Sequence, residues 1–133
     1  MNPFHNPIFL SKVLKVYLFD IDRLKRFDDE KLRKYQDRHL KKMVQFAYSV
    51  PLYHDKYKKA GIYPNDIKGI KDIGKLPLVS KHDIKKYYPE GIVSSKTDKD
   101  HLVKVSTSGT TGKSLSIYVD MFDIVMGLFG YLR

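Results

Sequence analysis

A short segment rich in glycine and hydroxyl side chains contains the residues best suited to bind phosphate. It reads Ser106-Thr107-Ser108-Gly109-Thr110-Thr111-Gly112-Lys113. Gly109 and Gly112 let the backbone bend and approach an anion closely, because no side chain intervenes. Consecutive backbone N–H groups in such a turn can form an anion-binding nest, the hydroxyls add donors, and Lys113 adds a mobile positive charge. The segment therefore predicts a phosphate-binding loop.

The best-known phosphate loop, the P-loop, is a poor match to this segment. It requires a glycine five positions before the glycine of its Gly-Lys-Ser/Thr triplet, and Thr107 occupies that position relative to Gly112. Residues 115–119 alternate apolar and polar side chains and predict a strand, whereas a P-loop opens a helix. A P-loop kinase or GTPase is therefore disfavoured. An ordinary hairpin turn remains the alternative interpretation.

The elements that must position the loop begin with two helices. Apolar residues at three- and four-residue steps predict a first helix with one apolar stripe. The stripe consists of Leu10, Val13, Leu14, Tyr17, Leu18, Ile21 and Leu24. Packing on another helix is favoured for it over a membrane surface. A second helix, over roughly residues 29–49, is predicted to carry Leu40, Met43, Val44 and Ala47 on one face.

Shorter elements follow and lead into the loop. Ser80 and Asp83 have the spacing of a capping box at a helix start. Residues 101–105 and 115–119 predict strands that enter and leave the loop, and Asp120 is placed to cap a final helix. That helix is predicted to bury Met121, Ile124, Val125, Leu128 and Leu132. The predicted fold class is α/β, and within this chain α+β: N-terminal helices followed by strand, phosphate loop and strand.

The loop and three segments upstream of it resemble those of a known superfamily. The segment from Thr107 to Lys113 resembles the ATP-phosphate loop of the acyl-adenylate-forming (AMP-binding) enzymes. Upstream, residues 48–53, 76–84 and 88–91 resemble the phenylacetate–coenzyme A ligase branch, which includes proteins named for capsular polysaccharide biosynthesis. The resemblance covers roughly residues 35 to 133.

The resemblance implies an acid–thiol ligase that uses ATP, Mg²⁺ and, as co-substrate, coenzyme A. A small-molecule carboxylic acid would attack the α-phosphorus of ATP to give an acyl-adenylate and pyrophosphate, and coenzyme A would then accept the acyl group. Lys113 would act as the catalytic cation on the departing pyrophosphate. The cofactor-binding residues implied are Thr107, Ser108, Gly109, Thr110, Thr111, Gly112 and Lys113. No metal ligand is assigned, since the Mg²⁺ carboxylate is expected beyond Arg133.

The chain has 133 residues, enough for one small domain. Members of the resembled superfamily are considerably longer, so residues 1–133 are expected to form the N-terminal part of an AMP-binding domain. Within it, residues 1–100 would be a mainly helical lead-in and residues 101–133 the strand, phosphate loop, strand and helix. The missing C-terminal part of the same polypeptide would be its partner. The chain alone is expected to be inactive; a truncated gene product or an interrupted reading frame are alternatives.

Composition and charge leave a second interpretation open. The formal net charge is +10, but basic residues are scattered among acidic ones, which is typical of solvated helix faces. The alternative is a small basic, noncatalytic interaction domain that binds nucleic acid or an acidic partner. No cysteine is present, and no uncharged apolar run reaches membrane-spanning length. A cytoplasmic location without specific nucleic-acid binding is therefore expected.

Overall fold

The computed structural model describes residues 5–20, 22–108 and 114–131. The α-helices are α1 (Pro7–Lys15), α2 (Asp29–Ala47), α3 (Pro51–Lys59), α4 (Lys81–Tyr87) and α5 (Met121–Tyr131). The strands β1 (Leu102–Ser106) and β2 (Ser116–Asp120) lie between α4 and α5. Short turns connect them: a π-helical turn at Val16–Asp20 and 3-10 turns at Leu24–Arg26, Pro64–Asp66, Ile70–Lys75, Glu90–Ile92 and Lys99–His101.

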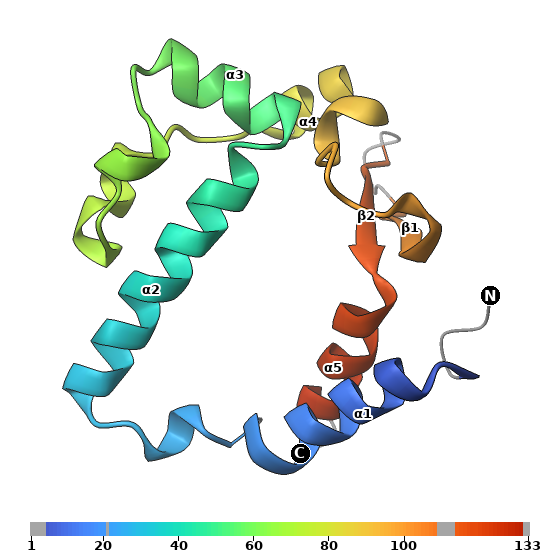
Figure 1. The fold of residues 1–133 in the computed structure, drawn as a ribbon. Helices are drawn as coiled ribbons and strands as arrows, with labels where there is room; N and C mark the ends of the chain where they lie inside the picture. The colour runs from blue at the N-terminus through green and yellow to red at the C-terminus, as the bar shows by residue number, and fades with distance from the viewer. Residues whose placement is uncertain (1–4, 21, 109–113, 132–133) are drawn as a thin grey trace.

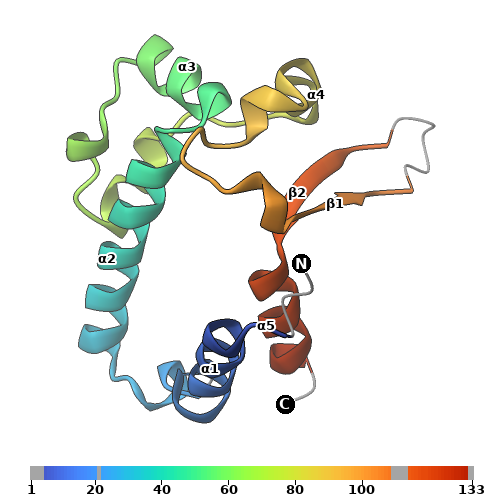
Figure 2. The ribbon, with the colours of Figure 1, turned by 45° about the vertical axis from the view of Figure 1, so that its right-hand side comes forward.

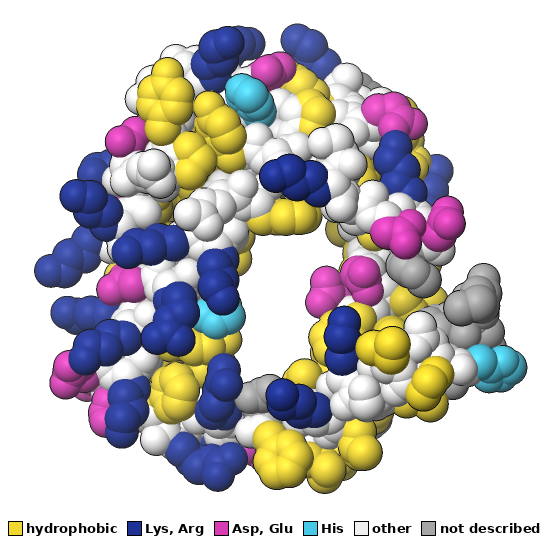
Figure 3. Space-filling view, in the orientation of Figure 1, with side chains coloured by type: hydrophobic (Ala, Val, Ile, Leu, Met, Phe, Trp, Pro, Cys, Tyr) yellow, Lys and Arg dark blue, Asp and Glu magenta, His cyan; other side chains and the backbone are white. Residues whose placement is uncertain are grey.

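The elements are arranged around an open centre (Figure 1). Helix α2 forms one side, α3 and α4 lie above it, the hairpin and α5 form the opposite side, and α1 lies along the lower edge. The space-filling view shows the same opening through the molecule (Figure 3). The predicted order of helices followed by two strands is therefore confirmed. Within the described residues the chain is mostly helical, and its sheet has two antiparallel strands.

Helix α2 forms where the sequence predicts it. The Asp28 carboxylate accepts a hydrogen bond from the Lys31 N–H at 2.8 Å and caps the helix start. On the predicted apolar face, Leu40 and Val44 are buried, whereas Met43 is 65% exposed. Helix α2 thus packs against neighbouring elements through a narrower stripe than its apolar sequence suggests.

The hydrophobic core lies where α2 meets α3 and the turns that follow. Leu40, Val44, Tyr57 and Ile67 form one buried cluster. Partly buried apolar side chains surround it: Ala47, Tyr48, Tyr53, Ile62, Ile70 and Leu76. This core holds α2 and α3 together and lies away from the hairpin, so the phosphate-loop segment depends on separate contacts for its position.

Helix α1 departs from the predicted pattern. Its start is capped by the Asn6 side chain, which accepts a hydrogen bond from the Ile8 N–H at 2.9 Å. The predicted continuous helix is interrupted by the π-helical turn Val16–Asp20. Helix α1 contacts α5 through Phe9, whose ring meets that of Phe122 edge-on at 6.1 Å between centroids.

The predicted apolar stripe of the first helix is therefore not buried as a unit. Leu10, Leu14 and Leu18 are 46%, 57% and 54% exposed. Tyr17 of the stripe does pack on a helix, since its ring lies 5.0 Å from that of Phe129 in α5. For the three leucines the expected covering helix is not found within the described residues. Ile21 lies outside the described residues.

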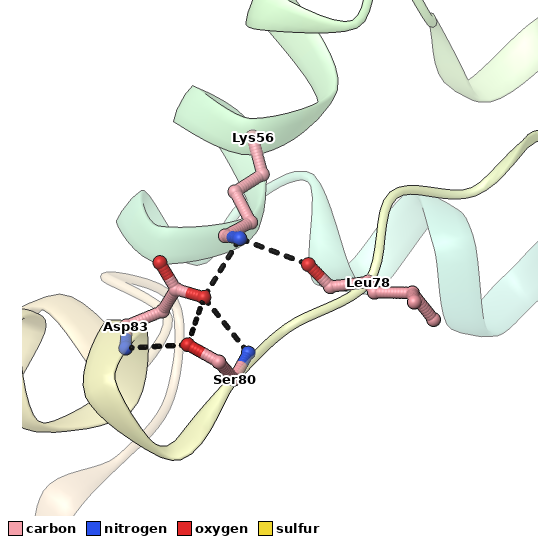
Figure 4. A network of polar contacts seen from close by, with 4 residues as sticks. All are labelled: Lys56, Leu78, Ser80 and Asp83. Carbon is pink, nitrogen blue, oxygen red and sulfur yellow. Dashed lines mark hydrogen bonds and ion pairs between the residues drawn. The ribbon is translucent and has the colours of Figure 1, made fainter.

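Helix α4 begins with the predicted capping box, which is confirmed. The Ser80 hydroxyl accepts a hydrogen bond from the Asp83 N–H at 3.2 Å, and the Asp83 carboxylate accepts one from the Ser80 N–H at 2.8 Å. Lys56 of α3 adds an ion pair to Asp83 at 2.7 Å and donates to the Leu78 carbonyl at 2.8 Å. Figure 4 shows these four residues meeting: Lys56 comes from α3, Leu78 and Ser80 from the segment just before α4, and Asp83 from α4. The network joins the two helices.

Candidate phosphate-loop site

The candidate site is the end of the hairpin formed by β1 and β2. The strands pair antiparallel from Leu102 opposite Asp120 to Ser106 opposite Ser116. Each strand lies one residue later in the sequence than predicted, so the predicted strand–loop–strand order is confirmed with a small shift. Figure 2 shows the hairpin extending away from α2 and α3, with α5 continuing directly from β2.

Three contacts hold the two sides of the loop together at its base. The Thr107 N–H donates to the Leu115 carbonyl at 2.9 Å, and the Leu115 N–H donates to the Thr107 hydroxyl oxygen at 3.1 Å. The Ser106 and Ser116 hydroxyl oxygens lie 2.8 Å apart. The chain therefore leaves and re-enters the hairpin at fixed, adjacent points.

The predicted site residues divide into two groups. Ser106, Thr107 and Ser108 are described and exposed at the hairpin end. The others, Gly109, Thr110, Thr111, Gly112 and Lys113, lie outside the described residues. Their assigned roles stay predictions.

The described hydroxyls retain hydrogen-bonding capacity toward a ligand. Thr107 uses its side-chain oxygen as an acceptor from the Leu115 N–H, and a hydroxyl that accepts still has its own proton to donate. Ser106 and Ser116 share one hydrogen bond, so only one of their two protons is used between them. The Thr107 hydroxyl can therefore donate to an anion beyond the end of the strands, which is the chemistry a phosphate requires.

One face of the hairpin is polar and packs against the segment after α4. The Tyr118 ring stacks on that of Tyr88, with centroids 5.9 Å apart and planes within 5°. The Lys104 ammonium lies 5.4 Å from the centre of the Tyr88 ring. The Tyr118 hydroxyl donates to that of Tyr88 at 3.5 Å and, together with Lys104, lowers the pKa of Tyr88. The same contact raises the pKa of Tyr118.

The other face of the hairpin is apolar. Because successive strand residues point to opposite faces, Val103 and Val105 lie on the face opposite Lys104, and register places Ile117 and Val119 beside them. Val105 is 43% exposed and Ile117 is 41% exposed. The hairpin thus has one face fixed by Tyr88 and another face that is open near the loop.

The segment that leads into the hairpin is tied to the helices by a buried serine, Ser94. The Ser94 hydroxyl is 2.6 Å from that of Ser49, just beyond α2, and Ser94 is only 1% exposed.

After the hairpin, helix α5 begins with the predicted cap: the Asp120 carboxylate accepts a hydrogen bond from the Phe122 N–H at 2.7 Å. Val125 is buried as predicted, but Leu128 is 59% exposed, since α1 covers only part of α5. Leu132 lies outside the described residues.

Sequence reasoning missed the residues that support the loop from a distance. Tyr88 was part of a recognised segment, but nothing in the sequence pointed it toward Lys104 and Tyr118. The signal in the sequence for a two-faced hairpin was the alternation of Lys104 and Tyr118 with apolar β-branched residues. A cavity of about 720 Å³ at the hairpin base, lined in part by Phe9, Phe46 and Leu102, was equally unforeseen.

In residues 5–20, 22–108 and 114–131, no group of three or more His, Cys, Asp or Glu side chains is placed to hold a metal ion. No helix in these ranges is long and apolar enough to cross a membrane.

Comparison with known proteins gives partial matches to one kind of enzyme. No family model matches the sequence. The chain is 35% identical over 82 residues to a phenylacetate-coenzyme A ligase of Aromatoleum evansii, covering 61% of this chain and 18% of that protein. It is 31% identical over 77 residues to the Escherichia coli K12 enzyme of the same name, covering 57% of this chain and 17% of the enzyme. These names give no support to the capsular polysaccharide branch expected above.

A solved structure matches a larger share of the chain. The crystal structure of 2-hydroxyisobutyryl-CoA ligase in complex with 2-HIB-AMP and CoA aligns with a TM-score of 0.62 and 25% identity, covering 73% of this chain and 22% of that chain. The chain thus spans about a fifth of the length of the relatives it matches. It is homologous over part of its length to the phenylacetate–coenzyme A ligases, and its fold corresponds to part of an adenylate-forming acyl-CoA ligase.

Proposed function

We propose that this chain is the N-terminal part of an ATP-dependent, phenylacetate–CoA ligase-like enzyme and that its hairpin loop binds the phosphates of ATP. The observation that carries the proposal is the closure of the hairpin end by Thr107 and Leu115. This closure brings both ends of a Gly- and Thr-rich segment together in a chain homologous to acid–thiol ligases.

The proposed reaction has two steps. A carboxylate oxygen of the acid attacks the α-phosphorus of ATP, and the bond from that phosphorus to the bridging oxygen of pyrophosphate breaks. The thiol of coenzyme A then attacks the acyl carbon, and AMP leaves. Negative charge builds up on the departing pyrophosphate, so groups that hold it act mainly on the transition state.

The chain's own residues would serve the first step by binding and orientation. The hydroxyls of Ser108, Thr110 and Thr111 donate to the β- and γ-phosphates, as do the backbone N–H groups at Gly109 and Gly112. Lys113 follows the charge of the leaving group. Thr107 contributes differently, because its side chain also fixes the loop to Leu115.

The domain boundaries follow from the same proposal. Residues 1–100 form the helical lead-in, residues 101–133 form the phosphate-loop segment, and together they are one part of an AMP-binding domain. The rest of the ligase supplies the pocket for the acid, the Mg²⁺ ligand and the coenzyme A site.

The decisive experiment is acid-dependent ATP–pyrophosphate exchange by the full polypeptide that its gene encodes, with phenylacetate and 2-hydroxyisobutyrate among the acids tested. Exchange that requires an acid supports adenylation, and its loss in Lys113→Ala supports the loop assignment. Residues 1–133 expressed alone should show no exchange. Acid-dependent pyrophosphate release by those residues alone would contradict the proposal that adenylation requires the rest of the ligase.

A further inference from the structure

One side of α1 carries a row of leucines that the described residues leave uncovered. Leu10, Leu14 and Leu18 recur every four residues and therefore lie along one side of the helical segment. They are between 46% and 57% exposed. Helix α5 meets this segment beside the row, where Phe9 contacts Phe122 and Tyr17 contacts Phe129.

The row is part of a larger exposed surface, here called the α1 apolar patch. Its members are Leu10, Leu14, Leu18, Phe19 and Leu24. Figure 3 shows hydrophobic side chains gathered along the lower edge of the molecule, where α1 lies, with Lys and Arg side chains beside them. Single exposed apolar residues are ordinary, but a contiguous group of this kind marks an interaction surface.

The charge around the patch is positive. Residues 5–26 contain five Lys and Arg residues and two Asp residues, a net charge of +3. One of the acidic side chains, Asp22, forms an ion pair with Lys25 at 2.8 Å. Lys15, which is exposed, lies three residues before Leu18 and so borders the leucine row on the same side of the helix.

We propose that the α1 apolar patch binds the surface of an anionic lipid bilayer, with α1 lying in the interface. A helix with apolar residues on one side and Lys or Arg at its margin binds such surfaces through buried apolar area and attraction to anionic headgroups. Helix α1 has 9 residues, which is too short to span a bilayer. It therefore lies on the surface rather than crossing it.

Charge distinguishes a lipid surface from a second copy of the chain. Two copies joined through this patch would bring like charges of +3 together at the margin of the contact, and like charges across an interface oppose association. Anionic headgroups supply the complementary sign. The proposal does not depend on the phosphate loop, so its outcome is independent of the proposed ligase function.

The test is sedimentation of the full encoded polypeptide with vesicles. Vesicles of phosphatidylcholine mixed with phosphatidylglycerol should bind it, vesicles of phosphatidylcholine alone should bind it much less, and added salt should weaken the binding. The double variant Leu14→Glu/Leu18→Glu should lower the affinity by at least about tenfold, since burial of even one leucine is of that order. Ile73→Glu is the matched control, because Ile73 is 52% exposed and lies outside the patch.

A second variant guards against misfolding of the first. Lys12→Glu/Lys15→Glu changes only exposed residues and should reduce binding to the mixed vesicles while leaving the circular dichroism spectrum unchanged. Equal binding to both kinds of vesicle, no binding to either, or full binding by both double variants would overturn the proposal. So would concentration-dependent dimers abolished by Leu14→Glu/Leu18→Glu, or loss of stability in that variant, which would show a protein surface covering the patch.

Discussion

Lys56 of α3 and Asp83 of α4 form an ion pair of 2.7 Å, and the same Asp83 oxygen also accepts from the Ser80 N–H. The Asp83 carboxylate therefore completes the capping box of α4 and also links this helix to α3. The hydrogen bond from the Lys56 ammonium, and secondly those from Ser80, hold the pKa of Asp83 well below its ordinary value of 3.8.

The lowered pKa of Asp83 predicts acid sensitivity. A group whose pKa is lower in the folded state contributes stability that is present above its unfolded pKa and is lost as the pH falls. The contribution of Asp83 should be complete above its ordinary pKa of 3.8 and decline below it. Unfolding by urea as a function of pH should show a shallower acid loss in Asp83→Asn than in the wild type. An unchanged acid slope would show that this carboxylate is not responsible.

Ser80→Ala tests the cap without touching the charges of the pair. It removes the hydroxyl that accepts from the Asp83 N–H and should cost about 1 kcal/mol in the free energy of unfolding. Ser80→Thr keeps an oxygen in place and serves as the control. Equal stability of the alanine and threonine variants would rule out the hydroxyl as the stabilising group.

Gly69 and Gly74 should respond differently to alanine. A Cβ at Gly69 would overlap the Asp37 carboxylate, which accepts from the Ile70 N–H at 2.7 Å, whereas a Cβ at Gly74 meets open space. Gly69→Ala should therefore destabilise the chain by about 1–3 kcal/mol, and Gly74→Ala should cost little. Thermal unfolding of the two variants side by side decides this; a cost at Gly74 equal to that at Gly69 would contradict the packing argument.

Lys113 and Thr107 should affect adenylation to different degrees in the full polypeptide. Lys113→Ala should slow ATP–pyrophosphate exchange at saturating acid by roughly 10²–10³-fold, by analogy with the loss of one oxyanion-hole donor. Thr107→Val removes the acceptor of the Leu115 N–H and should slow exchange less, with Thr107→Ser retaining the wild-type rate. Exchange at the wild-type rate in both Lys113→Ala and Thr107→Val would show that the loop is an ordinary turn with no role in adenylation.

The tyrosine pair beside the hairpin gives a spectroscopic prediction. Tyr118→Phe removes the hydroxyl that donates to Tyr88, so the pKa of Tyr88 should rise toward its ordinary value of 10.0. Carbon NMR of ring-labelled tyrosine across alkaline pH measures the shift. Tyr63→Phe, an exposed position outside the pair, should leave the Tyr88 titration unchanged. A Tyr88 pKa unaffected by Tyr118→Phe would place the two hydroxyls out of contact.

The features that could be predicted from the sequence are local ones. Asp28, Ser80 and Asp120 cap helices because each side chain reaches an N–H only two or three residues further on. The hairpin was predictable for a similar reason, since alternation is read from adjacent residues. The likeness of the loop to an ATP-phosphate loop also rests on one continuous segment.

The tertiary structure alone decided which surfaces are covered and what supports the loop. Contacts such as Lys56–Asp83, Ser49–Ser94 and Tyr88–Tyr118 join residues far apart in sequence, and periodicity carries no information about such pairs. Leu14 and Val44 are both apolar residues on helical stripes, yet one is 57% exposed and the other 1%. Burial depends on which neighbouring element packs against a face, and that is fixed by the path of the whole chain rather than by the residues of one helix.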